Sequence, residues 1–133
     1  TPKAPVSAKG TVLLVEDRAA VRRGERAMLE HLGYGVIEAR TGAEGLDLYR
    51  KQERSIDIIL TDLVMPVMGG AEMIRRLRAE GAEVPILAMT GHPGEVGEEE
   101  PRPVGVSAVL NKPLRMDELV RALQAATLQA PEL

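Results

Sequence analysis

Short apolar runs alternate with longer segments of helical periodicity along this chain. The runs at 11–15, 36–39, 56–60, 85–89 and 106–110 are mostly aliphatic, and their length predicts strands that are buried on both faces. Between them, apolar residues at helical spacing predict helices from 19 to about 32, over 43–52, over 71–79 and from 116 onward. Strands that alternate with helices predict an α/β fold, in which helices cover both faces of a parallel sheet.

The same spacing predicts which side of each helix faces the core. The expected inward residues are Ala20, Val21, Ala27, Met28 and Leu32 in the first helix, Ala43, Leu46 and Tyr49 in the second, Met73, Ile74 and Leu77 in the third, and Met116, Leu119, Val120 and Leu123 in the last. Thr41 and Glu44 have the spacing of a capping box, which predicts the start of the second helix.

The stretch 91–105 departs from the pattern, because it holds four glycines and three prolines. Pro101 and Pro103 would each remove a helical hydrogen bond and clash with the preceding turn. We therefore expect the fourth helix to be short or irregular. The acidic run at 98–100 is expected to be a solvated loop, and His31 and His92 are expected to lie at the surface.

The composition indicates one domain, since the chain has 133 residues, of which 44% are apolar. We expect residues 1–10 to form a linker or disordered arm, residues 11–128 the domain and residues 129–133 a frayed tail. The Pro-rich start fits a module from a longer polypeptide. A net charge of −3 without basic clusters argues against direct nucleic-acid binding. No signal peptide or membrane span is visible, so we expect a cytoplasmic protein without membrane contact.

Polar residues stand at the carboxyl ends of four predicted strands. They are Glu16 and Asp17, Asp62, Thr90, and Lys112. Because the carboxyl ends of parallel strands meet at one edge of the sheet, these side chains are expected to converge where α/β proteins bind ligands. For any one of them, the alternative is a residue that only caps a turn.

Three carboxylates at one edge repel one another and need a shared cation. Mg²⁺ suits them, since it takes oxygen ligands and keeps several waters. Neighbouring strand residues point opposite ways, so Asp17 is expected to bind the metal directly and Glu16 through water. A carboxylate beside a divalent ion can act as a nucleophile toward phosphorus, which is the role we expect for Asp62. Lys112 and Thr90 would then contact phosphoryl oxygens.

Four motifs together resemble the receiver domain of two-component response regulators and of hybrid sensor histidine kinases. They are Val-Leu-Leu-Val-Glu-Asp, Thr-Asp-Leu-Val-Met-Pro-Val-Met-Gly-Gly, Met-Thr-Gly and Asn-Lys-Pro, in the family's order and spacing. The resemblance covers residues 11–127. It implies a flavodoxin-like doubly wound fold of five strands in the order 2-1-3-4-5.

The resemblance also implies a role for each site residue. Asp62 would accept a phosphoryl group from a phosphohistidine of a sensor histidine kinase or of a histidine phosphotransfer domain. The metal ligands would be Glu16, Asp17, Asp62 and the Val64 carbonyl. Thr90 would be the switch hydroxyl, Lys112 the phosphate contact, and the Lys112–Pro113 bond would be cis.

Two features depart from the family's pattern. Val109 stands where the family usually has Tyr or Phe, so a readout that turns an aromatic ring inward is absent. The second departure is the Gly- and Pro-rich stretch 91–105, which falls on the family's usual signalling face. Phosphorylation could order this stretch, or the output could leave by another surface.

Two other functions stay open at this point. One is a pseudo-receiver that folds but serves only as an interaction scaffold. The other is a phosphatase-like hydrolase with an Asp nucleophile; such sites usually carry a second Asp two residues on, where this chain has Val64. We expect that the isolated domain is not an enzyme beyond its own phosphotransfer and dephosphorylation. Kinase domains could precede the linker in a longer polypeptide.

Overall fold

The structure, a computed structural model, describes residues 9–65, 68–91 and 105–129 of the chain. The strands in this part are β1 (Thr11–Val15), β2 (Gly35–Ala39), β3 (Ile58–Asp62), β4 (Ile86–Thr90) and β5 (Ala108–Asn111). The helices are α1 (Ala19–His31), α2 (Gly42–Gln52), α3 (Gly70–Ala79) and α5 (Met116–Gln129), and a 3-10 turn (Glu53–Ser55) follows α2. The expected irregular fourth helix and His92 fall in 92–104, which lies outside the described residues. Most of the expected arm and tail also lies outside the described residues.

All neighbouring strands pair in parallel, in the order β2-β1-β3-β4-β5. The predicted fold class and strand order are therefore confirmed. The chain first adds β2 outside β1 and then returns to place β3 on the other side of β1. This reversal leaves the carboxyl ends of β1 and β3 next to each other, at the place where open α/β sheets bind ligands.

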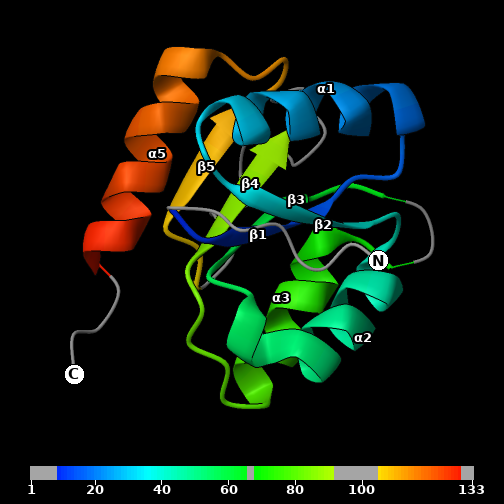
Figure 1. The fold of residues 1–133 in the computed structure, drawn as a ribbon. Helices are drawn as coiled ribbons and strands as arrows, with labels where there is room; N and C mark the ends of the chain where they lie inside the picture. The colour runs from blue at the N-terminus through cyan, green and yellow to red at the C-terminus, as the bar shows by residue number, and fades with distance from the viewer. Residues whose placement is uncertain (1–8, 66–67, 92–104, 130–133) are drawn as a thin grey trace, which may run out of the picture.

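The helices form two layers around the sheet. Figure 1 shows α1 and α5 on one face and α2 and α3 on the other. Successive residues of β1 enter opposite cores, so that Leu13 packs in one cluster with Met73 of α3, and Leu14 packs in the other with Leu29 of α1 and Leu119 of α5. This alternation is why the central strands read as continuous apolar runs.

Most of the predicted elements are confirmed to within a few residues. The bounds of β1 match, and β5 begins at Ala108, two residues later than expected. Thr41 caps α2 as predicted, since the Glu44 N–H donates to Thr41 Oγ1 at 3.0 Å. Glu44 Oε1 accepts from the Arg40 N–H at 2.8 Å, one residue before the cap.

The predicted inward face of the first helix is only partly correct: Met28 and Leu32 pack against the core, but the alanines do not. Glu25 and Leu29 are the buried residues of α1, whereas Ala20 and Ala27 are exposed. The pattern misled because alanine counts as apolar although it has little surface to bury, and because glutamate counts as polar. Two smaller errors are similar, since Ala43 in α2 and Met116 at the start of α5 are exposed.

Within the described residues, none of the helices is long and apolar enough to cross a membrane.

Two glycines provide a test of this packing. A Cβ on Gly70, at the start of α3, would lie 2.1 Å from the Asp62 carbonyl oxygen, whereas a Cβ on Gly24 in α1 would meet nothing within 4 Å. We expect Gly70→Ala to lower the free energy of unfolding by about 1–3 kcal/mol through overpacking. Gly24→Ala should raise it by about 0.5–1 kcal/mol, because alanine costs less backbone entropy in a helix. Denaturant unfolding measures both, and equal effects would contradict this packing.

Candidate functional site

Three carboxylates meet at the carboxyl edge of the two central strands. Glu16 and Asp17 directly follow β1, and Asp62 is the last residue of β3. One oxygen from each carboxylate lies within 4.8 Å of the others. The strand order therefore brings together residues that are 46 positions apart in the sequence, as the sequence analysis predicts.

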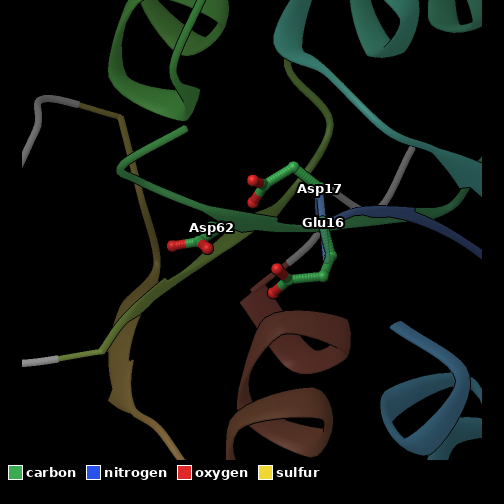
Figure 2. A group of neighbouring side chains, drawn as sticks. All are labelled: Glu16, Asp17 and Asp62. Carbon is green, nitrogen blue, oxygen red and sulfur yellow. The ribbon is translucent and has the colours of Figure 1, made fainter. Parts of the chain in front are cut away.

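Glu16 and Asp17 leave the backbone on opposite sides, as Figure 2 shows. The Glu16 side chain lies on the side of α1 and α5 and is completely buried, whereas Asp17 is only half-buried. Asp62 is also buried, at 5% exposure. Asp17 is therefore the carboxylate in this group that is most open to solvent.

Lys112 neutralises part of this negative charge. Its ammonium donates to Glu16 Oε1 at 2.7 Å and to Asp62 Oδ2 at 3.0 Å, and its side chain is 11% exposed. Burial alone would lower the pKa of Lys112, but the hydrogen bonds to Glu16 and Asp62 outweigh it and raise the pKa above its ordinary value. The ammonium thus stays charged over the whole physiological range.

Thr90 ends β4 beside Lys112, as the sequence predicts. Thr90 is buried, and its backbone carbonyl accepts the N–H of Lys112 at 2.8 Å. The Lys112–Pro113 bond is cis, as the resemblance implied. Because the Lys112 N–H is hydrogen-bonded to the Thr90 carbonyl oxygen, a movement of Lys112 would also move the end of β4.

A cavity of about 350 Å³ opens over Asp62 and Lys112. Its other lining residues are Arg18, Val21, Val64, Gly91 and Pro113. Val64 is 49% exposed, and its N–H lies 3.4 Å from Asp62 Oδ1, which is long for a hydrogen bond. Asp62 therefore faces a solvent-accessible space in which a small anionic group would fit.

Two arginines at the start of α1 contact Glu16, which the sequence analysis did not anticipate. Arg22 Nη1 donates to the Glu16 carbonyl oxygen at 2.9 Å, and its Nε pairs with Glu38 Oε1 of β2 at 3.0 Å. The Arg18 N–H donates to Glu16 Oε2 at 3.1 Å. No short sequence signal marks Arg22, because its contacts depend on where α1 crosses the strand ends.

Glu25 is a second functional candidate that the sequence analysis missed. It is 4% exposed, and within the described residues its Oε1 is buried without a hydrogen-bond partner. Burial, and then the negative charge of Glu16, raise the pKa of Glu25 to about 8. A signal existed, since Glu25 lies four residues before the apolar Leu29 on the same helix face.

The donor set suits a hard divalent cation. Glu16, Asp17 and Asp62 offer only oxygen atoms, and the carboxylate charge exceeds what one ammonium can balance. Among the described residues, no cysteine or histidine joins this group. The residues therefore fit Mg²⁺ better than a thiolate- or imidazole-seeking metal.

The family follows from a match along most of the chain. Residues 12–124 match the response regulator receiver domain, so the chain belongs to this family. The uncharacterized transcriptional regulatory protein YkoG of Bacillus subtilis is 31% identical over 121 residues, which are 91% of this chain and 52% of YkoG. The sensor kinase CckA of Brucella abortus is 38% identical over 87 residues, 65% of this chain and 9% of CckA. The chain thus spans about half of one relative and a small part of the other.

Solved structures agree with the family. The chemotaxis protein CheY4 of Vibrio cholerae superposes with a TM-score of 0.75 at 31% identity, over 90% of this chain and 99% of that one. The chain is accordingly a phosphoacceptor receiver domain of two-component signalling.

Removing the Lys112 ammonium tests the charge balance. In metal-free protein, we expect Lys112→Met to lower the free energy of unfolding by about 3 kcal/mol, because two buried carboxylates lose their partner. Since folding raises the pKa of Lys112, the difference from the native protein should be complete below its ordinary pKa of 10.5 and vanish as the pH rises through the folded value.

Denaturant unfolding at several pH values measures this difference. Lys51→Met is the matched control, because Lys51 pairs with Asp47 at the surface and should cost less than about 1 kcal/mol. Equal losses for the two variants would contradict the charge balance.

Proposed function

We propose that Asp62 is the phosphoacceptor of this receiver domain and takes its phosphoryl group from a phosphohistidine. One observation carries the proposal: the buried Asp62 carboxylate lies beside two further acids, accepts a hydrogen bond from Lys112 and faces a cavity of about 350 Å³. The alternative, an aspartate that only caps a turn, gives no reason for an ammonium and three carboxylates to converge.

The transfer forms a bond between an Asp62 oxygen and phosphorus and breaks the bond between phosphorus and the histidine nitrogen. The histidine leaves with a proton from solvent. Mg²⁺, when bound, supplies positive charge that screens the acids and the incoming phosphoryl oxygens. Asp17 would bind it directly because it is the most open of the three acids, with Asp62 and the Val64 carbonyl, and Glu16 would act through water.

Lys112 and Thr90 would contact the phosphoryl group once it is on Asp62. Lys112 already reaches Asp62 Oδ2, so a small movement brings its ammonium to a phosphoryl oxygen. The Thr90 hydroxyl would donate to another oxygen. Phosphorylation adds roughly −1.5 to −2 charges, so these two residues gain a partner that exists only in the modified state.

This switch would work without an aromatic ring on β5. Val109 occupies that position and is 37% exposed. The hydrogen bond from the Lys112 N–H to the Thr90 carbonyl oxygen instead joins the two residues that would respond to the phosphoryl group. We propose that phosphorylation changes the surface where β4 and β5 end.

The partner in this proposal is a sensor histidine kinase or its histidine phosphotransfer domain. The similarity to part of CckA favours a kinase-linked context, and the similarity to YkoG favours a separate regulator. We also propose that residues 1–10 form a linker, residues 11–128 the receiver and residues 129–133 a tail, and that the protein is cytoplasmic. Catalysis by the isolated domain would extend only to its own phosphotransfer and dephosphorylation.

Of the two alternatives, the pseudo-receiver scaffold would leave the acidic site without a use. The phosphatase-like hydrolase needs a second acid near Asp62 for proton transfer, and Val64 cannot serve. Both alternatives are therefore weaker than the phosphoacceptor.

Asp62→Asn tests the phosphoacceptor. We expect the native protein to gain the mass of one phosphoryl group on incubation with acetyl phosphate and Mg²⁺, and Asp62→Asn to gain none, since an amide is a poor nucleophile. Asp57→Asn is the control, because Asp57 directly precedes β3, at the end away from Asp62, where it accepts the Thr11 N–H. Mass spectrometry of the intact protein gives the result.

Stable labelling of Asp62→Asn would overturn the assignment. If the native protein shows no adduct, a titration with beryllofluoride separates two cases. Tight binding of this phosphoryl mimic would indicate rapid dephosphorylation, whereas no binding would favour the scaffold.

The metal ligands can be tested without any phosphoryl donor. We expect Asp17→Asn to weaken Mg²⁺ binding by about tenfold or more, which is about 1.4 kcal/mol, because one of the three carboxylates is lost. Asp47→Asn, an exposed aspartate of α2, should leave the affinity unchanged. Titration calorimetry of protein stripped with a chelator measures the affinities. Unchanged binding by Asp17→Asn would exclude Asp17 as a ligand.

A further inference from the structure

Glu25 is a buried acid that the proposed phosphotransfer does not use. It lies in the middle of α1, one turn before Leu29, which packs with Leu14 of β1 in the core between the sheet and the helices α1 and α5. An apolar side chain would satisfy this position. Glu25 instead places a carboxyl group there, with 4% of the residue exposed.

The surroundings of Glu25 favour its protonated form. Its Oε1 is buried without a hydrogen-bond partner in the described part of the chain, so a negative charge on it would lack both water and a donor. Of the arginines in its own helix, Arg22 and Arg26 pair with Glu38 of β2, and Arg23 is exposed. The buried residues of α5 carry no charge; they are Leu119, Ala122, Leu123 and Ala126.

The charges that act on Glu25 all belong to the acidic site. Glu16 at the end of β1 and Asp62 at the end of β3 disfavour its ionised form, and Lys112 beyond β5 favours it. Burial has the largest effect, and together these influences place the pKa of Glu25 at about 8. At neutral pH, Glu25 is therefore mostly a neutral carboxylic acid beside a negatively charged site.

We propose that Glu25 tunes the charge of the magnesium site by giving up its proton to solvent when Mg²⁺ binds the acids Glu16, Asp17 and Asp62. This inference rests on the proposed function, because it requires Mg²⁺ at that cluster. Two positive charges there offset Glu16 and Asp62, whose negative charge adds to the effect of burial on Glu25. Ionised Glu25 then adds a fourth negative charge that interacts electrostatically with Glu16 and Asp62.

The sign of the pH dependence follows from linkage. The metal-free protein holds the Glu25 proton up to about pH 8, and the Mg²⁺-bound protein loses it at lower pH. Between these two values, binding releases a proton, so the affinity for Mg²⁺ rises with pH. A change of about one unit in the pKa of Glu25 corresponds to about tenfold in affinity.

The test compares the native protein with Glu25→Gln, which keeps the shape of the side chain and cannot titrate. Calorimetric titration of Mg²⁺ at about pH 7 in two buffers of different ionisation enthalpy counts the protons released. Titrations from about pH 6 to pH 9 give the affinity. Both proteins contain His31 and His92, so any difference between them belongs to Glu25.

The native protein should release a fraction of a proton and bind Mg²⁺ up to about tenfold more tightly at the high end of this range. Glu25→Gln should release less and show a flatter profile. Equal proton release and parallel profiles in the two proteins would overturn the inference while leaving the magnesium site intact. Absence of Mg²⁺ binding to the native protein would instead overturn the proposed function, and the inference with it.

A measurement on the native protein alone covers the case in which Glu25→Gln does not fold. Carbon NMR of protein labelled at the glutamate carboxyl groups should show one resonance that titrates near pH 8 and moves to lower pH when Mg²⁺ is added. If every glutamate resonance titrates below about pH 6 without Mg²⁺, the inference is wrong.

Discussion

The repulsion among the carboxylates at the ends of β1 and β3 is the constraint on which the rest of the site depends. Three carboxylates have oxygens within 4.8 Å of one another, and the two buried ones, Glu16 and Asp62, need positive charge nearby. Lys112 supplies part of it and, in doing so, connects the end of β5 to β1 and β3 through two hydrogen bonds. The remaining negative charge makes the site receptive to a divalent cation, and the same ammonium is in position for a phosphoryl oxygen.

The apolar frame keeps this repulsion from relaxing. Val15 directly precedes Glu16, and Leu60 lies two residues before Asp62. Both side chains are completely buried between the two helical layers. Because both faces of the central strands are packed, the backbone cannot carry the acids apart without opening the core. At the start of α3, Gly70 packs so closely on the Asp62 carbonyl that a Cβ does not fit. The rigid frame thus preserves a site that is electrostatically unfavourable until a cation binds.

The sequence predicts the sheet and the convergent site well because both follow from local pattern and topology. A strand buried on two faces must be continuously apolar, and parallel strands must end at one edge, so Asp62, Glu16 and Lys112 can be placed near one another without a structure. The orientation of α1 is less predictable. Its inward stripe contains Glu25, which periodicity counts as a surface residue, and its exposed side contains Ala20 and Ala27. The contact of Arg22 with the Glu16 carbonyl depends on a long side chain crossing between elements, and no spacing rule predicts such contacts.

The neutral Glu25 and the charged Lys112 show two different ways to keep an ionisable group in a core. Lys112 is buried with two carboxylate partners, and its hydrogen bonds outweigh its desolvation. Glu25 has no comparable partner among the described residues, and it avoids the cost of a buried charge by remaining protonated. Lys112 therefore keeps a permanent positive charge at the site. Glu25 would become negatively charged only when the electrostatic potential at the site changes. A leucine at position 25 would pack there with a smaller loss of stability. The acid is therefore best explained by its electrostatic interaction with the acidic site.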